Sequence, residues 1–103
     1  MEPMRSDPHE WEPEISLEGE IDYFSTLDVW HAATDAMNRF GPYVVLDLAG
    51  VTFIDVAGVG ILVHVHEEAA RRGGRLTLAS VPPSVARLIR LTGLDHQLEF
   101  RDP

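Results

Sequence analysis

Carboxylates are the chemically capable side chains that this chain offers in greatest number. Its 103 residues include 17 acidic and 8 basic residues. Asp22, Asp47 and Asp55 close or follow predicted strands, and Asp47 and Asp55 are expected near one edge of a sheet, where α/β proteins bind ligands. Together, the three carboxylates would suit a small enzyme. No base or nucleophile accompanies them, however, so we expect that the chain is not an enzyme.

Motifs for nucleophilic or nucleotide chemistry are missing from the sequence. None of the serines lies in a G-x-S-x-G turn, and there is neither a phosphate-binding loop nor any lysine. Gly58-Val59-Gly60 matches only the first half of a dinucleotide-binding G-x-G-x-x-G. We therefore expect no cofactor.

Metal ligands are also poorly placed. The absence of cysteine excludes disulfides, thiol catalysis and cysteine-based zinc sites. His64 and His66 are two residues apart, which on a helix turns their side chains about 200° from each other. His64 with Glu67 or Glu68 is interpreted as a surface contact. We expect no metal site.

The net charge of −9 limits the classes of partner. A negative surface repels phosphate backbones, so we expect no nucleic acid. A basic patch on another protein is a more natural partner, although the charge can also serve only to keep the protein soluble. The longest apolar run, Val59 to Val65, is far short of the roughly 20 residues that span a membrane. Without a signal peptide, the chain is expected to be cytoplasmic and not inserted in a membrane.

The elements that must position these residues alternate along one predicted domain, residues 14–103. Residues 1–13 are predicted to be a flexible tail, with Trp11 expected to pack back on the domain. The remaining elements are predicted from apolar spacing and turn residues. They are a strand at 14–22, a helix at 26–40, a strand at 43–48 that resumes at 51–55, a helix from Ala57 or Gly58 to Arg72, a strand at 75–80, a helix opened by Pro82-Pro83 and capped by Gly93, and a short strand that includes Leu98 and Phe100.

Start signals and apolar spacing support the first helix. Ser25 and Asp28 form an S-x-x-D start signal, and apolar residues recur at helical spacing at Leu27, Trp30, Ala33 or Thr34, and Met37. The same kinds of signal mark the ends of the other elements. The resulting order, β-α-β-α-β-α-β, predicts an α/β fold whose sheet is largely parallel and covered by helices.

The turn at residues 53–60 reads F-I-D-V-A-G-V-G and is the most unusual local feature. A strand ends there, Asp55 follows as the predicted cap of the next helix, and small residues lead into that helix. Helix N-termini carry partial positive charge and free N–H groups. Small side chains at this place let another molecule approach the backbone, or let the helix pack closely on the sheet.

Four segments of the chain resemble the motifs of STAS domains, the anti-sigma-factor antagonist family. Residues 45–62, V-L-D-L-A-G-V-T-F-I-D-V-A-G-V-G-I-L, resemble the core motif of the family. Residues 19–22 read G-E-I-D, residues 71–78 read R-R-G-G-R-L-T-L, and residues 91–95 read L-T-G-L-D. These match the family's strand end, helix-to-strand passage and closing segment in the right order.

The resemblance implies both a fold and a task. The fold is α/β and SpoIIAA-like, with a small mixed, mostly parallel sheet packed by helices. The task is to bind an anti-sigma factor, often a serine kinase of the GHKL type, and so to free the sigma factor for transcription. In this bacterial signalling family the kinase phosphorylates a serine in a D-S-[ST]-G turn, and the phosphate breaks the complex. The domain is thus a partner and a substrate, not a catalyst.

The sequence departs from the family pattern at the phosphorylated position. Val56 stands where the serine would follow Asp55, and Ala57 comes next, so neither position has a hydroxyl group. We predict an antagonist without the usual phosphorylation switch. A second role remains open, as the STAS subunit of an ABC-type lipid transporter or of a multi-protein signalling complex. The first strand of the family fold is also expected to be short or missing, because residues 1–13 lack a strand pattern.

The predicted partner-binding surface is the turn together with its neighbours. It comprises Asp22, Ser25, Thr26, Asp55, Val56, Ala57, Gly58 and Val59. Val56 and Ala57 are expected to contact the partner from exposed positions, and Gly58 is expected to be required by the backbone. Relocated phosphorylation at Ser25 or Thr26 is an alternative, but capping of the first helix by Ser25 is favoured. A homodimer is left open.

Overall fold

Runs of apolar and β-branched residues form strands that lie parallel in one sheet. The computed structural model describes residues 13–101. Within that range the sheet has four strands in the order β1-β2-β3-β4. They are β1 (Glu14–Ile21), β2 (Tyr43–Ile54), β3 (Arg75–Ala79) and β4 (Glu99–Arg101), and each neighbouring pair runs parallel.

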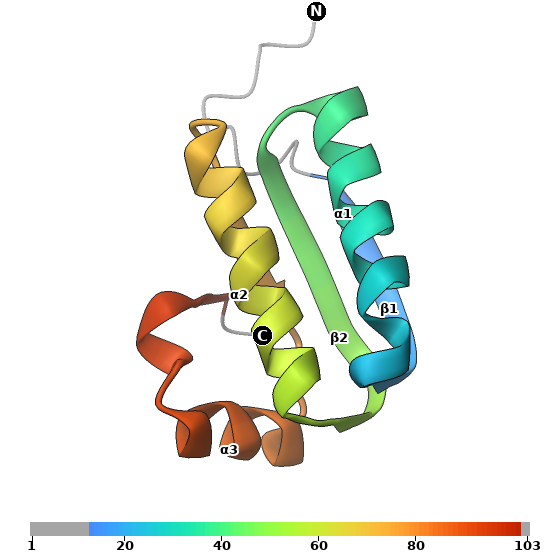
Figure 1. Ribbon diagram of the computed structural model, residues 1–103, viewed down its shortest axis with the longest axis vertical. Coiled ribbons are helices and arrows are strands. Elements are labelled where there is room, and N and C mark those ends of the chain that lie inside the picture. The colour runs from blue at the N-terminus through green and yellow to red at the C-terminus, as the bar shows by residue number, and fades with distance from the viewer. Residues whose placement is uncertain (1–12, 102–103) are drawn as a thin grey trace, which may run out of the picture.

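Parallel neighbours require crossover connections, and helices supply them here. The helices are α1 (Thr26–Phe40), α2 (Val56–Arg71) and α3 (Pro83–Thr92), with short 3₁₀ turns η2 (Tyr23–Ser25) and η3 (Asp95–Gln97). In Figure 1, α1 and α2 lie side by side over one face of the sheet, and α3 lies at the end where β2 finishes. The predicted β-α-β-α-β-α-β order is confirmed over the described residues.

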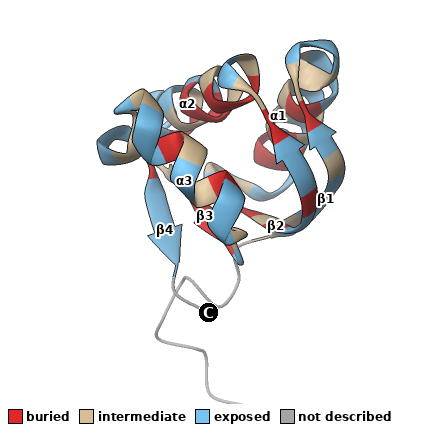
Figure 2. Ribbon diagram, turned by 90° about the horizontal axis from the view of Figure 1, so that it is seen from below, coloured by how far each residue is buried: buried red, intermediate tan, exposed pale blue. Residues whose placement is uncertain are grey.

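The hydrophobic core lies between the sheet and its helical layer. Figure 2 shows the buried residues gathered on the sides of α1 and α2 that face the strands. Side chains alternate along a strand, so every second residue of β2 and β3 points to the helices. The fully or nearly fully buried members of this core include Val44, Leu46 and Leu48 of β2, Leu76 and Leu78 of β3, Val29, Ala33, Ala36 and Met37 of α1, and Leu62, Val65 and Ala69 of α2.

The opposite face of the sheet carries charged side chains. Glu14 of β1 and Arg101 of β4 belong to the two edge strands, and their side chains form an ion pair at 2.8 Å. The register places both on the face away from Leu46 and Leu78. The helical layer covers only one face, but Val45 at the centre of the other face is also buried, with 1% of its surface exposed.

Two sequence expectations are corrected by the packing. The strand expected to break at Ala49-Gly50 is one continuous β2, and the irregularity takes the form of register shifts against β1. The apolar stripe of α1 is confirmed at Ala33 and Met37, and Trp30 packs against the core, but Leu27 is not part of it. Val29, Ala33, Ala36 and Met37 are buried, whereas Leu27 is 66% exposed. Leu27 and Val29 are both apolar, so contact with α2 and the sheet decides which of the two faces inward.

The N-terminal prediction falls largely outside the described residues. The proposed tail with Trp11, and the question whether a first strand of the family fold is short or missing, concern residues 1–12. Pro13 lies inside the described range, and its carbonyl accepts a hydrogen bond from the Val45 amide at 2.9 Å. The β1–β2 pairing therefore begins one residue before β1. Between residues 13 and 101, no helix is both long and apolar enough to cross a membrane.

Candidate functional site

Asp55 joins the end of β2 to the start of α2. One carboxylate oxygen, Oδ1, accepts a hydrogen bond from the Gly58 amide at 2.8 Å, which makes Asp55 the side-chain cap of α2. The other oxygen, Oδ2, accepts from the Tyr23 amide at 3.3 Å. The cap predicted from the sequence is confirmed. The same carboxylate also holds η2, a turn 32 residues earlier, against the start of α2.

A reciprocal pair of hydrogen bonds shapes η2. Asp22 Oδ1 accepts from the amides of Phe24 at 3.0 Å and Ser25 at 3.1 Å. Ser25 Oγ in turn accepts from the Asp22 amide at 2.9 Å. This is a capping box on the 3₁₀ turn. The expectation that Ser25 caps α1 is therefore wrong, because its hydroxyl is directed back to η2 and makes no cap bond to α1.

Gly58 lies where α2 passes very close to β1. A Cβ atom added at Gly58 would lie 2.0 Å from the carbonyl oxygen of Ile21 and 2.7 Å from Ile54 Cγ1. No side chain fits at these distances without movement of the backbone. The close approach brings the end of β1, and with it η2, next to the first turn of α2. It supplies a packing reason for a glycine at this position.

The residues after Asp55 differ sharply in exposure. Val56 is 66% exposed and Ala57 is half-buried. Gly58 and Val59 are buried, and Val59 has no exposed surface at all because it belongs to the core. The expectation that Val59 contacts a partner is therefore corrected. Of the four residues that follow Asp55, only Val56 and Ala57 present side-chain surface.

Thr26 completes the group predicted to lie near the turn. Its hydroxyl donates to the Tyr23 carbonyl at 3.1 Å, and its side chain is half-buried. Asp22, Ser25 and Thr26 therefore lie in or directly beside η2, which Asp55 ties to α2. The structure thus brings these three residues to the N-terminus of α2, as the sequence predicted, but it assigns their side chains to the internal bonding of η2.

Aromatic residues at this end of the molecule were missed by sequence reasoning. Tyr23 is 70% exposed and Phe24 is 88% exposed, and their rings meet edge to face with centroids 5.4 Å apart. Leu27 of α1 follows them and is also exposed. A signal was present in the sequence, because two aromatics between the acid of a capping box and its serine lie in a turn too short to bury both.

Asp47 does not join Asp22 and Asp55. It lies within β2, eight residues before Asp55, which corresponds to roughly 26 Å of extended strand. Its Oδ1 accepts a hydrogen bond from the Ala49 amide at 2.9 Å. The expected meeting of Asp47 and Asp55 at one edge is wrong, because β2 continues past the point where the strand was predicted to stop. The three carboxylates do not form one site.

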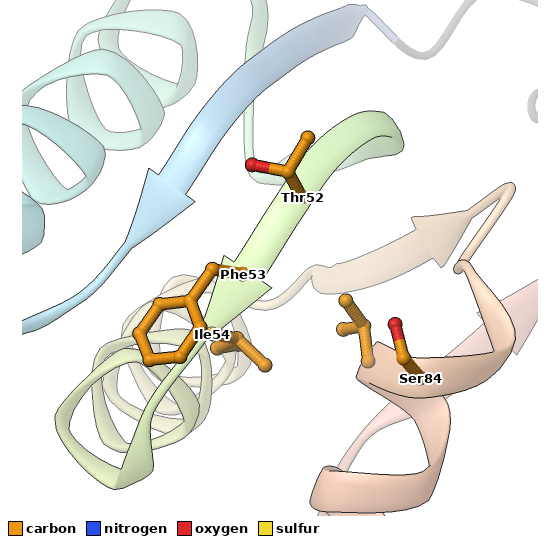
Figure 3. Close-up of a pocket in the computed structure, with 5 residues that line it drawn as sticks. Thr52, Phe53, Ile54 and Ser84 are labelled. Carbon is orange, nitrogen blue, oxygen red and sulfur yellow. The ribbon is translucent and has the colours of Figure 1, made fainter.

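A small pocket separates the end of β2 from the start of α3. Its volume is about 140 Å³, and it is lined by Thr52, Phe53, Ile54, Ser84 and Val85. Figure 3 shows Ser84 on α3 facing β2 across this space, while the Phe53 ring turns away from Ser84. The lining contains two hydroxyl groups and no charged side chain. Drug-sized ligands need roughly 300 Å³ or more, so this pocket is too small for such a ligand.

Histidine and glutamate side chains on α2 form surface contacts. His64 Nδ1 lies 3.4 Å from Glu67 Oε1, and both side chains are mostly exposed. Glu68 pairs with Arg71 and with Arg72, the latter at 2.7 Å. Over the part of the chain that the structure describes, no group of three or more His, Cys, Asp or Glu side chains is arranged to hold a metal ion.

Sequence comparisons place this arrangement among known proteins. A protein-family model described as "Mlab, STAS domain" matches residues 4–100. The anti-sigma F factor antagonist of Paenibacillus polymyxa is 28% identical over 81 residues, which cover 78% of this chain and 69% of that protein. The intermembrane phospholipid transport system binding protein MlaB of Escherichia coli (strain K12) is 29% identical over 80 residues, which cover 78% and 79%.

Solved structures share the fold. A putative anti-sigma factor antagonist from Thermotoga maritima matches with a TM-score of 0.74 at 24% identity, over 87% of this chain and 80% of that one. An anti-sigma factor antagonist from Mycobacterium paratuberculosis matches with a TM-score of 0.71 at 29% identity, over 84% and 74%. The unphosphorylated form of SpoIIAA matches with a TM-score of 0.72 at 22% identity, over 90% and 81%. The predicted STAS-like α/β fold is confirmed.

Proposed function

This chain belongs to the STAS domain family, and from that premise we propose that it is an anti-sigma-factor antagonist that docks its partner through the start of α2. The domain acts as a regulatory, protein-binding module in the cytoplasm and not as an enzyme. Its partner is an anti-sigma factor resembling a GHKL-type serine kinase. Binding withdraws that factor from its sigma factor and so changes transcription.

The observation that carries this proposal is the exposed Val56 at the N-terminus of α2. Two thirds of the Val56 residue is open to solvent, directly after the cap residue Asp55. A protein partner supplies apolar surface for such a side chain, which water does not. The similarity to the anti-sigma F factor antagonist of Paenibacillus polymyxa supports this choice of partner, as does 27% identity over 89 residues to the anti-sigma-B factor antagonist of Listeria monocytogenes.

The proposed antagonist lacks the phosphorylation switch at this turn. Val56 and Ala57 have no hydroxyl groups, so a kinase cannot transfer a phosphate to either. The Ser25 hydroxyl lies within hydrogen-bond distance of the Glu20 and Asp22 carbonyls, and the Thr26 hydroxyl donates to the Tyr23 carbonyl. We therefore propose that the chain stays in the binding-competent state when ATP is present, and that its amount in the cell sets its effect.

One specific observation supports a second candidate function. The similarity to MlaB, the binding protein of an intermembrane phospholipid transport system, is as strong as the similarity to the antagonists. In this alternative, the chain is the STAS subunit of a lipid transporter or of another multi-protein assembly. The same exposed turn would then bind a transporter subunit in place of an anti-sigma factor.

Direct binding to purified candidates tests the proposal. The anti-sigma factors of the source organism and the subunits of its phospholipid transporter are each titrated with the chain by calorimetry, with and without ATP. We expect an anti-sigma factor to bind, ATP not to release it, and Val56→Arg to abolish binding. The matched control is Phe40→Arg, an equally exposed position at the far end of α1. Binding only to transporter subunits would replace the proposed function by the alternative.

A further inference from the structure

Four exposed apolar side chains surround the proposed docking turn. They come from three elements, and we call them the aromatic patch: Tyr23 and Phe24 of η2, Leu27 of α1 and Val56 of α2. The bond between the Tyr23 amide and Asp55 holds η2 beside the start of α2, and the Tyr23 and Phe24 rings contact each other within η2. The patch is therefore a continuation of the proposed site and not a separate surface.

Hydrogen bonds fix the backbone that carries the patch, although the side chains of the patch are open to water. The capping box of Asp22 and Ser25 closes η2 from within, and Asp55 fixes η2 to α2. Each member of the patch is at least 66% exposed. Isolated exposed apolar residues are ordinary, but clustered ones mark sites of interaction. A pre-formed turn of this kind loses little conformational entropy on binding.

Acidic residues accompany the patch in the segments that form it. Glu20, Asp22, Asp28 and Asp55 lie within or directly beside η2 and the first turns of α1 and α2. No arginine occurs in those three segments. Negative charge also suits the N-termini of helices, which carry partial positive charge. Along these segments the apolar centre therefore has a negative border, a pattern that selects a partner of opposite charge.

We propose that the aromatic patch inserts into an apolar groove bordered by lysine and arginine side chains on the protein partner, with Phe24 as the anchor. This inference rests on the proposed function, since it names the surface chemistry of the same partner. Aromatic anchors near the centre of an interface commonly contribute most of the binding free energy. A lipid surface is a poorer fit, because anionic headgroups repel a border of carboxylates.

The anchor is tested with the purified anti-sigma factor that binds the unmodified chain. Phe24→Ser is compared with Phe40→Ser, because Phe40 is also mostly exposed and lies at the opposite end of α1. We expect Phe24→Ser to raise Kd at least about 10-fold and Phe40→Ser to change it less than about 2-fold. Circular dichroism establishes that both variants are folded. An unchanged Kd for folded Phe24→Ser would overturn the anchor.

The charged border is tested by two substitutions on α1 with the same change in charge. The substitutions are Asp28→Arg and Asp35→Arg. Asp28 lies in the first turn of α1, beside the patch, whereas Asp35 lies two turns further along and is also exposed. We expect Asp28→Arg to weaken binding several-fold more than Asp35→Arg, and we expect the difference to shrink as salt is raised. Equal effects of the two substitutions at low salt would overturn the proposed basic border.

The outcomes separate this inference from the proposed function. If the anti-sigma factor binds, Val56→Arg abolishes binding and Phe24→Ser has no effect, the function stands and the aromatic anchor fails. If the unmodified chain binds neither anti-sigma factors nor transporter subunits, both proposals fail. Sedimentation with phosphatidylcholine and phosphatidylglycerol vesicles tests the lipid surface. Vesicle binding that Phe24→Ser removes would overturn a protein groove as the occupant of the patch.

Discussion

The α-carbon of Gly58 faces the carbonyl oxygen of Ile21 so closely that a Cβ atom at Gly58 would lie 2.0 Å from that oxygen. This approach presses the first turn of α2 against the end of β1. Asp22 follows Ile21 and caps η2, and Asp55 precedes α2 and accepts a hydrogen bond from the Tyr23 amide of η2. One steric relationship thus sets the geometry on which the proposed docking surface depends.

Gly58→Ala is expected to destabilise the fold. The new methyl group meets backbone atoms, which cannot rotate away, so the loss should be at the upper end of the range of about 1–3 kcal/mol seen for overpacked sites. Thermal unfolding by circular dichroism measures it. The matched control is Gly60→Ala in the same helix, where an added Cβ meets nothing within 4 Å. Because alanine favours helix over glycine, that variant should be unchanged or more stable. Equal stability of the two variants would contradict the steric argument.

Asp55→Ala should cost stability and also loosen η2. Loss of a helix N-cap typically costs about 1 kcal/mol, and here the Tyr23 amide loses its partner as well. Hydrogen exchange should therefore accelerate at Tyr23 as well as at Gly58. Asp47→Ala is the control, because Asp47 accepts only the local Ala49 amide among the bonds described. Faster exchange at Gly58 alone would show that Asp55 does not hold η2.

Val56→Ser should restore a phosphorylatable site. The substitution places an exposed hydroxyl at the first position of α2. If the partner is a kinase-type anti-sigma factor, incubation with ATP should add one phosphate and release the complex, since a phosphate brings a charge of about −2 to the interface. Intact-mass spectrometry follows the addition, and Val56→Ala serves as the variant without a hydroxyl. If the Val56→Ser variant binds the kinase but gains no mass, this would argue against the proposal that the partner docks at the start of α2.

Gly74→Ala should lower the stability of the fold without changing the affinity for the partner. A Cβ atom at Gly74 would lie 2.1 Å from the Pro42 carbonyl oxygen, at the end of the molecule opposite the turn. We expect a destabilisation similar to that of Gly58→Ala, about 1–3 kcal/mol. Below its unfolding temperature, however, the variant should retain the Kd of the unmodified chain. A weakened Kd at a temperature where the variant is fully folded would extend the interface beyond the proposed site.

The local signals of the sequence predicted the elements well. The helix bounds at Thr26 and Phe40 and the Asp55 cap were read from neighbouring residues, because caps and apolar spacing are local properties. The stripe of α1 was predicted correctly at Ala33 and Met37 but not at Leu27, since Leu27 and Val29 are both apolar and only packing distinguishes them. The break in β2 was expected at Gly50, but pairing with β1 continues past it through register shifts.

By itself, the sequence determined the alternation of strands and helices, the family resemblance, and the absence of a hydroxyl group at positions 56 and 57. Each of these depends only on residue types and their spacing along the chain. Only the tertiary structure decided that Asp47 lies far from Asp55, that Val59 is core, and that Tyr23 and Phe24 stand exposed beside Val56. These facts depend on contacts between segments about 30 residues apart, in particular the close approach of Gly58 to Ile21, and no local pattern encodes such contacts.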